Sequence, residues 1–103
     1  MTETVAVEGT EPVVIRPAGD VVAALVPRLR TSLREVVAQG AREVVVDLTG
    51  VEMVDSSGIG LLIAAHNSLR KLGGRLAVIH ASKEILELLM TMRIHQHLGV
   101  SGD

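Results

Sequence analysis

The residues of this chain best suited to chemistry or recognition are concentrated in one short segment, residues 55–60, with the sequence DSSGIG. A carboxylate and two hydroxyls stand side by side, immediately before an apolar run with helical spacing. Asp and Ser are preferred N-cap residues, because they accept hydrogen bonds from the free amides of a helix N-terminus. The same amides and the helix dipole would also tolerate a phosphate on a first-turn serine. The segment therefore predicts either a simple helix cap or a turn that can carry an added anion.

The two glycines of this segment need a separate explanation. Each weakens the first turn of a helix by about 1 kcal/mol relative to alanine. Capping accounts for one polar residue of the segment. It does not explain why two serines are adjacent, or why Gly58 and Gly60 are present. We infer that something approaches this turn closely, and we expect it to be a binding surface.

Other kinds of site are weaker interpretations. Ser56 with a histidine and an aspartate could form a hydrolase triad, but the Gly-x-Ser-x-Gly motif is absent. His95 and His97 would share one face of a strand, yet two ligands without a cysteine or carboxylate nearby make a poor metal site. Gly58 and Gly60 belong to no nucleotide-binding fingerprint. We expect no enzymatic activity, no metal and no cofactor.

The composition describes one soluble domain. A length of 103 residues leaves no room for a second core, so residues 1–103 are expected to form a single domain. Ten basic and twelve acidic residues give a net charge of −2, and Phe, Tyr and Trp are absent. Neither an attractive field nor stacking platforms are available for nucleic acid, so we expect no direct nucleic-acid binding.

Localisation is predicted from what the chain lacks. It has no cysteine, no secretory leader at its N-terminus, and no apolar run near the roughly 20 residues that a membrane span requires. We expect a cytoplasmic protein without membrane insertion.

Alternating strand and helix signals surround the chemical segment. Short β-branched runs at 4–7 and 13–16 predict a hairpin across the turn at 8–12. A helix is expected to begin near Pro27 and end at Gly40, followed by a strand at 43–48 buried on both faces. A second helix would run from the chemical segment to Leu72, followed by a strand at 75–79, a third helix from Ser82 and an edge strand at 95–100.

These elements predict an α/β fold with a mixed β-sheet, antiparallel at the N-terminal hairpin and parallel through the helical crossovers, with flanking helices. Right-handed crossovers place the ends of the central strands at one edge, and residues 55–60 at that edge. The expected buried positions of the second helix are Gly58, Leu62, Ala65, Leu69 and Leu72, and those of the third are Ile85, Leu86, Leu88 and Leu89.

Residues 44–74 resemble the STAS domain of the anti-sigma-factor antagonist (anti-anti-sigma factor) family. The family signature is a hydrophobic strand ending in Asp-Leu-Ser or a near variant, then Asp-Ser-Ser/Thr-Gly-Leu/Ile-Gly, then a helix ending at Gly-Gly. Asp47-Leu48-Thr49, residues 55–60 and Gly73-Gly74 match it. A weaker resemblance covers most of the chain, including Gly19, Pro27, Leu29 and the helix around residues 86–92.

The resemblance implies a partner switch. The family serine that directly follows the motif aspartate is phosphorylated by an anti-sigma factor that is also a serine kinase, and this serine corresponds to Ser56. The unmodified protein would bind the kinase and release a sigma factor, and phosphorylation would break that complex. The alternative is a constitutive scaffold or transporter-associated module in which Ser56 only caps the helix.

Two departures from the family pattern bear on the partner. Relatives usually carry an acidic residue three positions after the loop glycine, where this chain has Val22, so either Asp20 substitutes or the kinase is handled differently. Many relatives continue into a final helix beyond the position of Asp103, so one side of the sheet is expected to be open to a partner or to a second copy in a homodimer.

The expected partner surface also includes two isoleucines about 100° from the core stripe. Ile59 and Ile63 would either face the partner or pack beneath a neighbouring loop. The full set of predicted partner-binding residues is Asp20, Asp55, Ser56, Ser57, Gly58, Ile59, Gly60 and Ile63.

Overall fold

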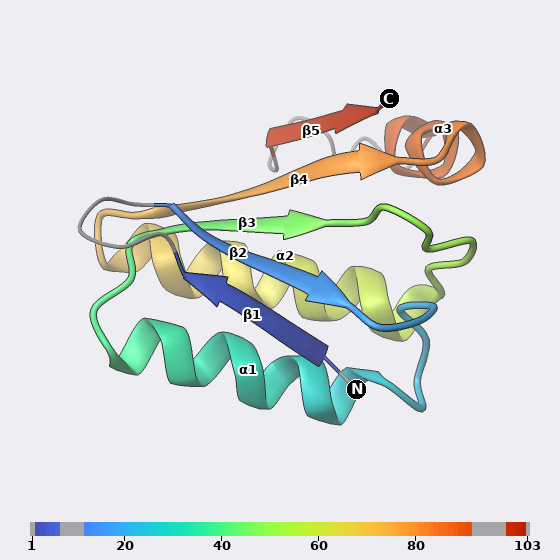
Figure 1. The fold of residues 1–103 in the computed structure, drawn as a ribbon. Coiled ribbons are helices and arrows are strands. Elements are labelled where there is room, and N and C mark those ends of the chain that lie inside the picture. Colours follow the sequence, from blue (N-terminus) through green and yellow to red (C-terminus); the bar gives the residue numbers. More distant parts are fainter. Residues whose placement is uncertain (1, 7–11, 92–98, 103) are drawn as a thin grey trace.

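A five-stranded mixed sheet with the strand order β1-β2-β3-β4-β5 forms the centre of this computed structural model, which describes residues 2–6, 12–91 and 99–102 (Figure 1). In chain order the elements are β1 (Thr2–Ala6), β2 (Val13–Pro17), α1 (Val26–Ala38), β3 (Glu43–Asp47), α2 (Ser56–Lys71), β4 (Arg75–Ala81), α3 (Lys83–Thr91) and β5 (Gly99–Gly102). The β1–β2 pair is antiparallel and the other three pairs are parallel. The predicted mixed α/β fold is confirmed, although the hairpin turn lies outside the described residues.

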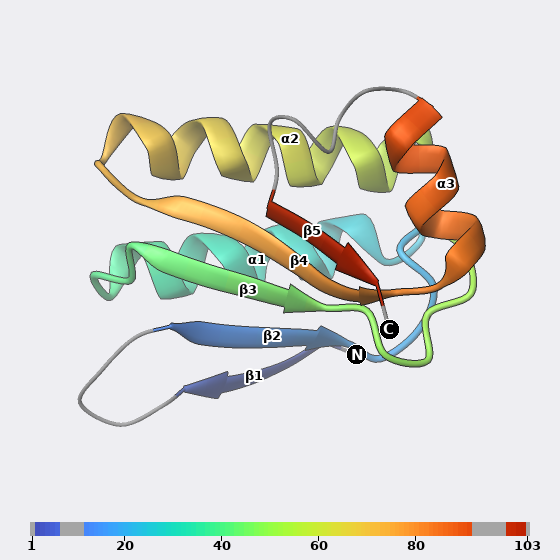
Figure 2. The same ribbon diagram turned by 90° about the horizontal axis from the view of Figure 1, so that it is seen from above.

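Helices α1 and α2 lie side by side on one face of the sheet, and α3 packs against β4 and β5 (Figures 1 and 2). Strand residues alternate accordingly: Val44 and Val46 are buried under the helices, whereas Val45 points to the other face and is half-buried. The prediction that β3 is buried on both faces is therefore wrong. Its apolar run reflects a strand in the middle of the sheet, whose second face is shielded only by neighbouring side chains.

The first helix forms where the sequence predicts it. Pro27 lies in the first turn, where its missing N–H costs nothing, and the chain leaves the helix through Gly40 at a φ of +105°. Leu29, Leu33 and Val36 are buried along one stripe.

The buried faces of the other two helices differ from the prediction in detail. Leu72 is 48% exposed because α2 ends before it, and Leu88 on α3 is 37% exposed. Ile59 and Leu61 are buried instead, because α2 packs against both the sheet and α1 and so buries a wider face than a single stripe. The strand predicted at 95–100 lies largely outside the described residues, while β5 begins at Gly99.

Candidate functional site

Asp55 closes the N-terminus of α2. Its Oδ1 accepts a hydrogen bond from the Gly58 N–H at 2.9 Å, and its backbone has the extended conformation common at an N-cap. Its Oδ2 accepts from the Ala23 N–H at 3.0 Å. Because Asp55 supplies the cap, the Ser56 hydroxyl is not needed for it.

The loop before α1 is fastened to the segment that leads into α2. Asp20 Oδ1 accepts hydrogen bonds from the N–H groups of Glu52, at 2.9 Å, and Met53, at 3.2 Å. The Val21 N–H donates to the Met53 carbonyl at 2.9 Å, and the Val21 carbonyl accepts from the Asp55 N–H at 3.2 Å. Two segments about 30 residues apart in the chain therefore form one structural unit.

Gly58 is required by this unit. A Cβ added at Gly58 would overlap the Val21 carbonyl oxygen and lie 2.8 Å from Val21 Cγ1. The close approach inferred for the glycines thus comes, at Gly58, from the chain's own loop. Gly60 differs, since it is exposed and a Cβ there would meet nothing within 4 Å.

The predicted partner residues divide into an exposed and a buried group. Ser56, Ser57 and Gly60 are exposed, and Asp20, Asp55 and Ile63 are intermediate. Gly58 is buried and Ile59 is 5% exposed within the core, so for Ile59 the structure selects packing over an outward orientation. The Ser56 hydroxyl has no hydrogen-bond partner within the described residues.

The surface around this turn contains apolar groups that sequence reasoning missed. Met53, two residues before Asp55, is 57% exposed although its backbone is bonded on both sides. A shallow hollow of about 280 Å³ adjoins the loop and is lined partly by Asp20, Val22 and Leu25. The sequence contains an indication that Met53 is exposed, because it lies between Val51 and Val54, whose side chains are buried.

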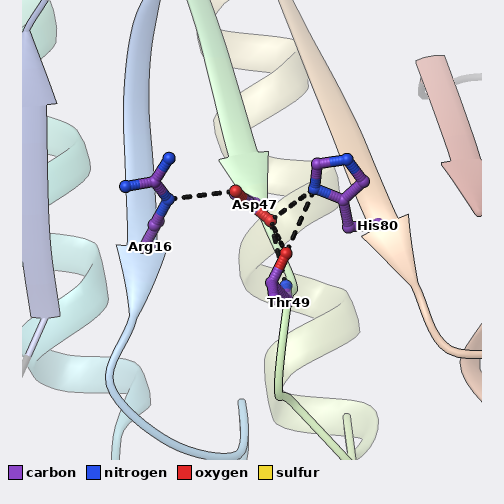
Figure 3. A network of polar contacts seen from close by, with 4 residues as sticks. All are labelled: Arg16, Asp47, Thr49 and His80. Carbon is purple, nitrogen blue, oxygen red and sulfur yellow. Dashed lines mark hydrogen bonds and ion pairs between the residues drawn. The ribbon is translucent and has the colours of Figure 1, made fainter. Parts of the chain in front are cut away.

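A polar network lies at the carboxyl end of β3, on the sheet face opposite α1 and α2 (Figure 3). Asp47 Oδ2 accepts from Arg16 Nε at 3.0 Å, and Asp47 Oδ1 lies 2.9 Å from His80 Nδ1. The same Oδ1 accepts from the Thr49 hydroxyl at 2.6 Å and from the Thr49 N–H at 3.0 Å. These contacts fix the turn through which the chain leaves β3 toward α2.

The two carboxylates at this end of the sheet are held in their charged form. Burial of Asp47 opposes the charge, but hydrogen bonds from Thr49, Arg16 and His80 prevail, so the pKa of Asp47 lies well below its usual range. The Gly58 N–H, aided by the Ala23 N–H, lowers the pKa of Asp55. Both groups are ionised at neutral pH.

Arg16 and His80 were not predicted as members of this network. The two residues share only their position, because each lies near the end of a strand that neighbours β3. On β4, the residue paired with Asp47 is Ile79, which directly precedes His80. His80 also has a φ of 58°, in the left-handed region that non-glycine residues rarely adopt. Strand order was needed to bring these side chains together.

The described residues assemble neither a hydrolase triad at Ser56 nor a metal site. The ring nitrogen Nδ1 of His80 faces Asp47 and Thr49, and within the described residues no histidine contacts the Ser56 hydroxyl. Residues 2–6, 12–91 and 99–102 contain no cluster of three groups suited to a metal ion. His95 and His97 lie outside those residues.

The fold and the site together define a small α/β domain that presents the capped N-terminus of a helix and two exposed serines at one edge of its sheet. The STAS domain model matches residues 3–101, and the chain belongs to the STAS domain family. No curated protein is significantly similar to it in sequence. None of the described helices combines the length and apolar character needed to cross a membrane.

Solved structures share this fold. An anti-sigma factor antagonist from Mycobacterium paratuberculosis aligns with a TM-score of 0.82 at 20% identity, over 100% of this chain and 87% of that one. The anti-sigma factor antagonist SpoIIAA in its unphosphorylated form gives 0.75 at 22% identity, over 100% and 88%. The Bacillus cell fate determinant SpoIIAA in its phosphorylated form gives 0.74 at 19% identity, over 100% and 93%.

Proposed function

We propose that this STAS domain is an anti-sigma-factor antagonist, which binds an anti-sigma factor with serine kinase activity and is switched off by phosphorylation of Ser56. The observation that carries the proposal is the state of Ser56. It is exposed in the first turn of α2, and its hydroxyl is left unbonded within the described residues because Asp55 caps the helix. Similar structures of antagonists, one of them phosphorylated, support the same reading.

The switch follows from charge. Phosphorylation would add nearly two negative charges beside the Asp55 carboxylate, which is already ionised and anchored by two backbone N–H groups. The helix N-terminus stabilises the phosphate, so the fold survives. A partner that covers Ser56 without a compensating cation would bury an unpaired charge, which costs several kcal/mol.

The partner would approach over the surface that remains open. Ser56, Ser57 and Gly60 are exposed, and Met53 offers an apolar side chain next to them. Gly60 leaves space for close approach of another backbone. Gly58 and Ile59 act from inside the domain by holding this surface in place.

The direct test uses an anti-sigma factor kinase from the same organism with ATP. Mass spectrometry is expected to find one phosphate, on Ser56, which Ser56→Ala abolishes and the matched control Ser57→Ala does not. Ser56→Asp is expected to weaken the complex by about tenfold or more, measured by calorimetry. Unchanged binding of Ser56→Asp would refute the switch, and a stable complex without phosphate turnover would favour the constitutive scaffold.

Asp20 is proposed to contact the partner, and in the structure it also holds the loop before α1 in place through hydrogen bonds. Substitutions at Asp20 can separate these two roles. Asp20→Asn keeps an oxygen for the Glu52 and Met53 N–H groups but removes the charge, whereas Asp20→Ala removes both. If the partner reads the charge, both variants weaken the complex. If Asp20 only orders the loop, Asp20→Asn binds like the wild type and only Asp20→Ala is impaired.

A further inference from the structure

An open groove runs between α1 and α2. It has a volume of about 380 Å³, and its floor is formed by the buried side chains of Leu33, Leu61 and Leu69. Its walls are lined by Val37, Ala38, Ala64, Ala65 and Ser68. In this open groove a hydrocarbon ligand would leave its outer side exposed to water. A helix, in contrast, can pack an apolar face against the walls and keep a polar face in solvent.

Two arginines complete the lining of this groove. Arg30 and Arg34 lie one turn apart on α1 and are exposed. Neither forms an ion pair within the part of the chain that the structure describes. Like charges at this spacing repel each other, so an anionic partner would relieve an existing cost.

Helix α3 has matching features on its solvent side. Glu84, Glu87 and Leu88 lie within about 100° of one another around the helix. Neither glutamate forms an ion pair with any residue described, and Leu88 is 37% exposed. Lys83 is also exposed, so this surface carries two negative charges and one positive charge, against two positive charges at the groove. The chain's own α3 contacts β4 and β5 at the opposite edge of the fold from α1 (Figure 2).

The lengths of the two surfaces also agree. Helix α3 has nine residues and is about 13 Å long at 1.5 Å per residue. The groove is lined over nine-residue stretches of both helices, 30–38 on α1 and 61–69 on α2.

We propose that the groove of one copy receives the exposed face of α3 from a second copy of this chain. Glu84 and Glu87 would pair with Arg30 and Arg34, and Leu88 would cover apolar wall. Because the two surfaces lie at opposite edges of the fold, a pair joined in this way still has a free α3 on one copy and a free groove on the other. The contact is therefore head to tail and continues into longer assemblies rather than closing as a symmetric dimer.

This association is independent of the Ser56 switch, because neither Asp55 nor Ser56 lines the groove. A nine-residue helix buries less surface than a stable interface requires, so the self-association is weak and visible only at high protein concentration. Its ion pairs make it sensitive to salt, since the screening length falls from about 10 Å at 0.1 M to about 3 Å at 1 M.

Sedimentation velocity of the full chain tests the proposal, at concentrations up to about 1 mM because the interface is small. The mean sedimentation coefficient is expected to rise with concentration past the dimer value at 0.1 M salt, and to fall back at 1 M. Arg30→Glu with Arg34→Glu, and separately Glu84→Arg with Glu87→Arg, should each weaken association at least about tenfold. Arg28→Glu, on α1 but outside the groove, should leave it unchanged.

Charge exchange provides the decisive result. The variant with all four substitutions, and an equal mixture of the two double variants, should both regain association that each double variant has lost. Circular dichroism and urea unfolding check that every variant is folded. A monomer at all concentrations, a closed dimer insensitive to these substitutions, or failure of the fourfold variant to recover would each overturn the proposal.

Discussion

A methyl group added at Gly58 is expected to have the opposite effect from one added at Gly60, although both glycines lie near the start of α2. Replacing glycine by alanine inside a helix normally stabilises it by about 1 kcal/mol. At Gly60 the new Cβ would point into open space, with nothing within 4 Å. Gly60→Ala is therefore expected to raise the free energy of unfolding by about 0.5–1 kcal/mol.

At Gly58 the same methyl group would meet the backbone of the loop before α1. It would overlap the Val21 carbonyl oxygen, so the loop must move and weaken the hydrogen bond from the Asp55 N–H. Overpacking costs about 1–3 kcal/mol and the hydrogen bond about 1 kcal/mol, against a helix gain of about 1 kcal/mol. Gly58→Ala is therefore expected to destabilise the domain by about 1–3 kcal/mol.

Urea unfolding measures both variants. Because the chain has no aromatic residue, far-ultraviolet circular dichroism is the appropriate probe rather than fluorescence. Equal m-values in the wild type and the variants would show that the midpoints report stability alone. If Gly58→Ala proved as stable as Gly60→Ala, the close packing of α2 on the Val21 loop would be refuted.

Three further substitutions probe the site and the core. Asp47→Asn should destabilise the domain at neutral pH and make its stability depend less on pH in acid. Because the pKa of Asp47 is lower in the folded state, its charge stabilises the fold above the unfolded pKa of about 3.9, and this stabilisation is lost as the pH falls below that value. Thermal melts of both proteins across this pH range would detect the difference. Asp55→Ala should lower Tm more than Asp55→Asn, because asparagine also caps a helix, and equal melting temperatures would contradict the assigned cap. Leu62→Ala, at a fully buried position, should cost about 2–5 kcal/mol in urea unfolding, whereas Leu72→Ala, at a position 48% exposed, should cost less than about 0.5 kcal/mol.

Most of the fold was predictable because its signals are local. Pro27 and Gly40 bound α1 within two residues, and the apolar run at 43–48 became β3. The predictions for Leu72 and Leu88 failed because periodicity identifies an apolar stripe but not its width or where the helix ends. Those properties depend on what the helix packs against.

The sequence predicted where the site lies, but only some of the residues that form its surface. The motif placed Ser56 at a helix N-terminus, where the structure has it, and Asp55 was one of two possible caps. Burial of Ile59 was an open alternative, because its position on a helical wheel does not reveal the neighbouring loop. The contacts of Arg16 and His80 with Asp47 could not be found without the order of the strands.

The sequence by itself determined which segments become helices and strands, and that a carboxylate and two serines open a helix at residues 55–60. These properties follow from hydrophobic period, turn residues and capping, which act between neighbours in the chain. Only the tertiary structure decided that Asp20 bonds to the segment leading into α2 and that Gly58 must lack a side chain because Val21 lies against it. The groove between α1 and α2, lined partly by arginines, is likewise a tertiary feature. Each of these depends on contacts between residues some 30 or more positions apart, which local pattern does not specify.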